Sequence, residues 1–193
     1  MNNASLWSLF LNAAVINNFV LSLFLGICPF LGISGKRDTA FRMGVAVIFV
    51  MVVSSAAAYG IHHLLVWLNA EYLQLIAYIA VIASTVQLVE MIIKKFSPAL
   101  FRALGIYLPL ITTNCAILGV ALFQTLREYT LAQSLVFSLG SGVGFTLALM
   151  LMAGFREDLA LAEVPSLVKG TALTLMLAGI LSLTFMGFGG LGG

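Results

Sequence analysis

Two cysteines are the residues of this chain best suited to do chemistry, and they occupy matching contexts. Cys28 lies in the segment Phe24-Leu25-Gly26-Ile27-Cys28-Pro29-Phe30-Leu31-Gly32. Cys115 lies in the segment Leu108-Pro109-Leu110-Ile111-Thr112-Thr113-Asn114-Cys115-Ala116-Ile117-Leu118-Gly119. Both segments contain the pattern Cys-x-x-Leu-Gly. A free cysteine usually packs as a small hydrophobic residue, but two cysteines at equivalent places of a repeated pattern favour a shared role.

The pair leaves several kinds of chemistry open. A disulfide could join the two segments, although an apolar interior needs no such link. A mononuclear metal site needs about four ligands, and the only histidines, His62 and His63, are better interpreted as interfacial residues. An iron–sulfur cluster takes four cysteine thiolates, so one chain would supply half of the set and a second protein the rest. A packing role without chemistry also remains open.

Composition places these cysteines in a membrane protein. The chain has 193 residues, of which 62% are hydrophobic and 8% are charged, and its mean hydropathy is +1.13. Soluble domains carry about 25% charged residues, so a soluble globule is excluded. The net charge of +2 and the absence of any long basic run argue against a nucleic-acid partner. Two cysteines are also too few for a disulfide-stapled scaffold.

Charge-free stretches predict the membrane spans. A helix needs about 20 mostly apolar residues to cross the hydrocarbon layer. Six stretches of at least 18 residues contain no Asp, Glu, Lys or Arg: 1–35, 43–70, 72–89, 103–126, 129–155 and 170–193. Their connections are too short for a separate domain. The sequence therefore predicts an all-α membrane protein in which residues 1–193 form one domain with six transmembrane helices.

The basic residues predict the orientation. Eight of them fall in the first, third and fifth connections: Lys36, Arg37, Arg42, Lys94, Lys95, Arg102, Arg156 and Lys169. Only Arg127 falls in the remaining connections. Because basic residues concentrate on the cytoplasmic side, both termini are expected outside.

The matching patterns also predict an internal duplication. Gly44-Val45 and Gly142-Val143 add a second weak correspondence, which gives two three-helix repeats, about 1–97 and 98–193. An odd number of helices inverts the second repeat relative to the first, as in many transporters. Pro and Gly interrupt the first and fourth stretches, and such interruptions point to a central site. Near that site, Thr113 and Asn114 are candidate hydrogen-bond donors to cysteine sulfur.

Several segments together resemble a known family. They are residues 17–21, 24–32 and 108–116, Arg156-Glu157, Val164-Pro165 and Phe185-Met186-Gly187-Phe188. They closely resemble the family of membrane proteins represented by RnfA of the Rnf electron-transport complex. NqrE of the sodium-translocating NADH:quinone reductase is a related protein. The resemblance runs nearly from end to end.

This resemblance implies a translocase component of the bacterial cytoplasmic (inner) membrane that binds no nucleotide itself. Its complex moves electrons between ferredoxin and NAD, coupled to Na⁺ or H⁺ transport. The resemblance also implies a [2Fe–2S] cluster whose iron is bound by Cys28 and Cys115 together with two cysteines of RnfE, a homologue of opposite topology. RnfB, RnfC, RnfD and RnfG complete the complex, and FMN, riboflavin and NAD bind only to other components. The alternative is a secondary transporter with inverted repeats, in which the cysteines merely pack.

Overall fold

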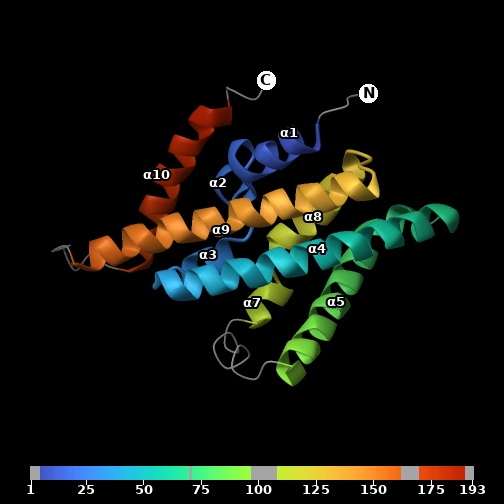
Figure 1. Cartoon of the computed structure of the whole chain (residues 1–193), viewed down its shortest axis with the longest axis horizontal. Helices are drawn as coiled ribbons and strands as arrows, with labels where there is room; N and C mark the ends of the chain where they lie inside the picture. Colours follow the sequence, from blue (N-terminus) through green and yellow to red (C-terminus); the bar gives the residue numbers. More distant parts are fainter. Residues whose placement is uncertain (1–4, 70, 97–107, 162–169, 190–193) are drawn as a thin grey trace.

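The computed structural model describes residues 5–69, 71–96, 108–161 and 170–189, and this part of the chain is helical without strands (Figure 1). This confirms the predicted all-α class. The elements in chain order are α1 (Leu6–Leu11), a π-helical turn η1 (Asn12–Ile16), α2 (Phe19–Leu23), α3 (Ile27–Ile33), α4 (Arg37–Trp67), a 3-10 turn η2 (Glu71–Leu73), α5 (Gln74–Phe96), α7 (Leu108–Thr112), α8 (Cys115–Leu126), α9 (Leu131–Leu161) and α10 (Thr171–Gly189).

Within the described residues, three helices are long and apolar enough to cross a membrane: α4, α5 and α9. They coincide with the second, third and fifth charge-free stretches. The other three stretches hold shorter apolar helices, over residues Leu6–Ile16, Leu110–Leu126 and Thr171–Gly187. The membrane character of the chain is therefore evident from its helices, whereas the count of six spans stays a prediction.

Helices α4 and α9, each 31 residues long, form the centre of the molecule and lie side by side (Figure 1). They run antiparallel, because the start of α4 meets the end of α9. Gly44 of α4 lies against the side chain of Thr146, and a Cβ at Gly142 of α9 would stand 2.9 Å from Ile48 Cγ1. Small residues let two helices approach closely where lipid offers no hydrophobic driving force.

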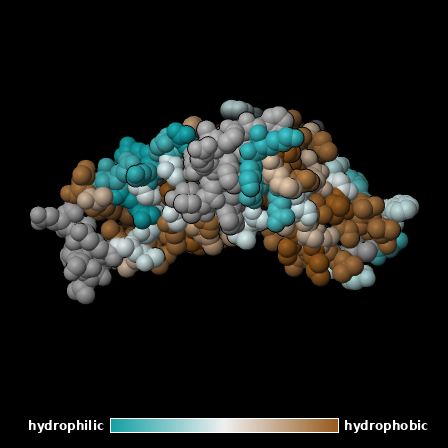
Figure 2. All heavy atoms as spheres, turned by 90° about the horizontal axis from the view of Figure 1, so that it is seen from below, coloured by the Kyte–Doolittle hydropathy of each residue, from teal (hydrophilic) through white to brown (hydrophobic). Residues whose placement is uncertain are grey.

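Charged side chains gather where α4 begins and α9 ends. Arg37 Nε lies 2.7 Å from a Glu157 carboxylate oxygen, and Arg37 Nη2 lies 3.6 Å from Asp158. Figure 2 shows a group of hydrophilic side chains at this end, toward the left of the view, and a second group nearer the middle. These pairs are about half exposed, so each contributes at most about 1 kcal/mol.

The first and fourth charge-free stretches are interrupted, as predicted, but the prolines do not cause the interruptions. Pro29 is the third residue of α3 and Pro109 the second residue of α7. In the first turn of a helix a proline lacks only an N–H that has no partner within the helix. The helices instead end at residues 17–18, 24–26 and 113–114.

Asn18 shows how such an interruption is stabilised inside the bundle. Its Oδ1 accepts hydrogen bonds from the backbone N–H groups of Val20 (3.1 Å) and Leu21 (3.5 Å) and so caps α2. Its Nδ2 donates to the carbonyl oxygens of Gly144 (2.7 Å) and Ala14 (3.3 Å). The buried Asn18 amide therefore pairs with backbone N–H groups at the start of α2 and with a backbone carbonyl group of α9.

Candidate functional site

The structure brings the turn before Cys28 into contact with Cys115. Cys115 is the first residue of α8, and its Sγ accepts a hydrogen bond from the backbone N–H of Gly26 at 2.9 Å. Gly26 caps α3, of which Cys28 is the second residue. Two segments that are far apart in sequence thus each place a cysteine in the first turn of a short helix, α3 or α8. The starts of these two helices are in contact.

Backbone conformation and close packing both require a glycine in this turn. Gly26 has φ +81°, a left-handed conformation that L side chains rarely adopt. A Cβ there would stand 2.7 Å from Phe145 Cε2 and 3.0 Å from Asn114 Oδ1. The neighbouring Leu25 side chain lies over Gly119, where a Cβ would be 2.8 Å from Leu25 Cδ1. The chain can reach Cys115 here because two glycines leave room.

Asn114 forms the other half of the junction. Its Oδ1 accepts a hydrogen bond from the Ala116 N–H at 3.0 Å and caps α8. The side chain is 3% exposed, and its Nδ2 has no hydrogen-bond partner. Thr113, the other predicted donor, is exposed. Cys115 is the first residue of α8, so it lies at the positive end of the helix dipole.

Both cysteines are free and exposed in the isolated chain. Cysteine is among the residue types most often buried, so a packing role predicts two buried side chains rather than two exposed ones. Beside Cys115 lies a cavity of about 320 Å³. It is lined by Ile79, Ile82, Ala83, Thr112, Thr113, Asn114, Cys115 and Leu118.

The donor set fits half of a cluster site. In the described part of the chain no three His, Cys, Asp or Glu side chains converge to hold a metal ion. Both thiols remain exposed at this junction, and the buried Asn114 amide without a hydrogen-bond partner lies next to Cys115. Two cysteine thiolates are half of the ligand set that an iron–sulfur cluster takes.

A polar network anchors the far end of α8. Ser55 Oγ donates to Gln124 Oε1 at 2.6 Å, and Gln124 Nε2 donates to the Ser55 carbonyl oxygen at 3.1 Å. The hydroxyls of Tyr78 and Thr125 are joined by a hydrogen bond of 2.7 Å. Because these contacts fix α8 to α4 and α5, they also restrain the helix that carries Cys115 at its other end.

Arg156 anchors α3 in a similar way. Its Nη1 donates to the Leu31 carbonyl oxygen (3.0 Å) and to Ser34 Oγ (2.9 Å), both at the end of α3. A cation is favourable at a helix C-terminus. Helix α3 is thus held at its end by α9 and at its beginning by the Gly26 turn. The sequence analysis used Arg156 for the topology and the family resemblance but gave it no role near the cysteines, and it did not single out Gly26.

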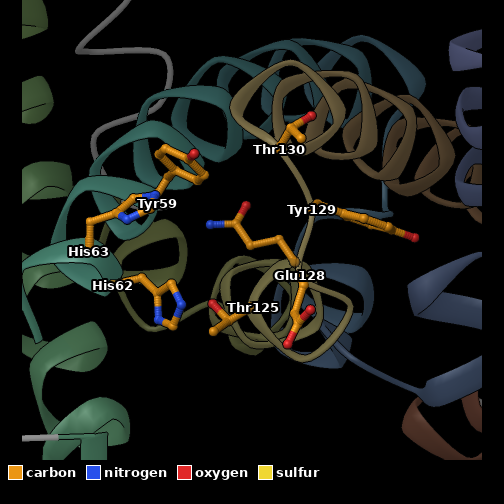
Figure 3. Close-up of a pocket in the computed structure, with 8 residues that line it drawn as sticks. Tyr59, His62, His63, Thr125, Glu128, Tyr129 and Thr130 are labelled. Carbon is orange, nitrogen blue, oxygen red and sulfur yellow. The ribbon is translucent and has the colours of Figure 1, made fainter. Parts of the chain in front are cut away.

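The histidines lie in a separate pocket of about 260 Å³ (Figure 3). Its lining residues are Tyr59, His62, His63, Gln124, Thr125, Glu128, Tyr129 and Thr130. The His63 ring packs edge-on against Tyr59, with 4.7 Å between centroids. Most of the length of α8 separates Cys115 from this pocket, which is about 15 Å of helix. The histidines are therefore not part of the cysteine site.

These features define a polytopic helical membrane protein that presents a pair of thiols where two broken segments meet. Over residues 6–192 the chain matches the family described as Rnf-Nqr subunit, membrane protein, and it belongs to that family.

Curated relatives are similar over almost their whole length. The chain is 54% identical over 182 residues to the A subunit of the ion-translocating oxidoreductase complex of Syntrophotalea carbinolica, covering 94% of each chain. It is 52% identical over 182 residues to the A subunit of the Na(+)-translocating ferredoxin:NAD(+) oxidoreductase complex of Acetobacterium woodii, covering 94% of this chain and 95% of the relative. The A subunit of the ion-translocating oxidoreductase complex of Aeromonas salmonicida is 50% identical to the chain over 184 residues, covering 95% of each chain.

Proposed function

We propose that this chain is the RnfA component of an Rnf complex, an ion-translocating ferredoxin:NAD oxidoreductase of the bacterial inner membrane. The relatives from such complexes share half of its residues along nearly the full chain. Within the complex the chain serves as a membrane electron carrier, and nucleotide and flavin chemistry (NAD, FMN and riboflavin) belongs to other components.

The carrier in this proposal is a [2Fe–2S] cluster that passes single electrons. Cys28 and Cys115 hold one half of it, and two cysteines of the homologous RnfE hold the other. The observation that carries this proposal is the hydrogen bond from Gly26 N–H to Cys115 Sγ, which joins the two cysteine turns while both thiols remain exposed. An exposed pair at one junction suits a group shared across a protein–protein interface.

The proposed topology has six spans, inverted repeats of about 1–97 and 98–193, and both termini outside. Its support is the antiparallel pair of equally long helices, α4 and α9, with an interrupted apolar segment before each. The repeat boundary, Arg102, Val164-Pro165 and Lys169 lie outside the described residues. RnfB, RnfC, RnfD and RnfG complete the proposed complex, and electron flow drives Na⁺ or H⁺ transport through it.

The test is to replace each cysteine in the complete complex. We expect Cys28→Ser and Cys115→Ser each to remove the EPR signal of the reduced cluster, lower the bound iron and stop electron transfer. The control is Ser84→Ala, because this exposed hydroxyl donates only to the Ala80 carbonyl oxygen of its own helix. Serine variants that keep iron and electron transfer would refute the proposal. They would instead favour the secondary transporter, for which the chain alone should catalyse uptake.

A further inference from the structure

We propose that Asn114 is a positioning residue that donates a hydrogen bond to sulfur at the Cys115 site and raises the reduction potential of the group held there. This inference rests on the proposed function, because the sulfur acceptor belongs to the cluster. It assigns a specific task to one amide hydrogen of this chain.

The amide orientation of Asn114 is fixed by its capping hydrogen bond. Its Oδ1 accepts from the Ala116 N–H at 3.0 Å, and the planar amide therefore turns Nδ2 away from the helix. The side chain is 3% exposed, and Nδ2 finds no acceptor within the chain. Leaving a buried donor unpaired costs at least what an ordinary hydrogen bond contributes. A native acceptor from outside the chain resolves this cost.

Asn114 and Cys115 line the same cavity, whose remaining walls are the apolar side chains of Ile79, Ile82, Ala83 and Leu118 together with Thr112 and Thr113. The Nδ2 atom of Asn114 is itself buried away from bulk water and has no hydrogen-bond partner. The acceptor therefore enters with whatever binds Cys115, and a cluster brings sulfur atoms that carry negative charge.

Asn18 is the other buried asparagine that caps a short helix in the described part of the chain. Its Nδ2 donates hydrogen bonds to the carbonyl oxygens of Gly144 and Ala14. The fold thus supplies acceptors for a capping amide that lies away from the cysteines. It supplies none for the amide that lies next to Cys115.

The chemical consequence follows from charge. Reduction adds one electron to the cluster and neither makes nor breaks a bond. Hydrogen bonds to the sulfurs stabilise the more negative, reduced state and so raise the potential. The Gly26 N–H already donates to Cys115 Sγ, and Asn114 adds a second donor from the opposite half-helix.

The experiment is an EPR-monitored redox titration of the complete complex with Asn114→Ala and Asn114→Asp. We expect Asn114→Ala to lower the equilibrium constant for reduction about tenfold, which is about 59 mV for one electron. Asn114→Asp keeps an oxygen that caps α8, and its potential should fall as the pH rises and the new carboxyl group ionises. Asn18→Asp is the matched control and should leave the potential unchanged at each pH.

Each outcome decides the question. Iron-loaded Asn114 variants with the wild-type potential would overturn this inference and leave the cluster intact. A wild-type complex without iron on Cys28 and Cys115 would overturn the proposed function as well. If neither variant retains iron, pulsed EPR of the wild-type complex labelled with ¹⁵N in asparagine side chains provides the answer. A coupling to an amide ¹⁵N supports the inference, and its absence contradicts it.

Discussion

Replacing Gly26 by alanine tests whether the turn between the half-helices positions the cysteines. The change adds one methyl group to a residue with φ +81°. The left-handed conformation costs an L residue roughly 1–2 kcal/mol. The new Cβ would also stand 2.7 Å from Phe145 Cε2 and 3.0 Å from Asn114 Oδ1, and overpacking of this kind typically costs about 1–3 kcal/mol. Together these costs amount to about 2–5 kcal/mol, and both neighbours are buried, so the turn must move.

A moved turn breaks the hydrogen bond from Gly26 N–H to Cys115 Sγ and displaces Cys28. Because about 1.4 kcal/mol corresponds to a factor of ten, we expect the native turn to lose more than tenfold in population relative to a displaced one. The measurement is iron per complex together with the EPR spectrum of the reduced protein. We expect a large loss of iron, or a changed spectrum in the fraction that retains it.

Gly60→Ala is the control for Gly26→Ala. Gly60 lies within α4, and a Cβ there meets nothing within 4 Å. Alanine is favoured over glycine in a helix by roughly 0.5–1 kcal/mol, so this variant should keep its iron and resist heat slightly better. A Gly26→Ala complex with full iron and an unchanged spectrum would show that the turn does not position the site.

Three further predictions test other parts of the structure. Gly144→Ala would place a Cβ 2.6 Å from the Ala14 carbonyl oxygen. We expect this clash to separate α9 from η1 and to lower the yield of inserted protein severalfold, as measured by immunoblot of membranes. Arg156→Ala removes two hydrogen bonds from the end of α3 and should destabilise the complex by about 1–3 kcal/mol, seen as earlier loss of iron on heating. The proposed topology predicts that Lys36→Cys reacts with a membrane-impermeant thiol reagent only from the cytoplasmic side and that Glu128→Cys reacts only from outside. The reverse labelling pattern would show that the orientation is the opposite of the proposed one.

Much of the architecture was predictable because lipid imposes strong constraints on sequence. Charge-free stretches located α4, α5 and α9, since a span must exclude charges over its length. The interruptions of the first and fourth stretches were also predictable in outline. Their positions were not, because Pro29 and Pro109 lie within the first turns of helices. The breaks are instead set by the asparagine N-caps that begin α2 and α8 and by left-handed residues between α2 and α3. The hydrogen bond from Asn18 Nδ2 to the Gly144 carbonyl oxygen depends on a tertiary contact with α9, and local sequence does not predict such a contact.

The candidate site was predictable in its residues but not in its geometry. The repeated pattern selected Cys28 and Cys115, and Asn114 followed from its place beside Cys115. The contact between Gly26 and Cys115 joins the two halves of the chain, and no local pattern encodes such a contact. One signal was present: glycine stands two positions before Cys28, where a positive φ and a close approach are both satisfied without a side chain.

The exposure of both thiols bears on how the protein is made. A newly inserted copy without its partner presents two unprotected sulfur atoms to peroxide and other oxidants, and oxidation beyond the sulfenic acid is largely irreversible. Under the proposed function, a copy made in excess over its partner would therefore stay open to irreversible oxidation. Balanced synthesis of the two proteins, and metal delivery soon after they meet, would protect the chain during biogenesis.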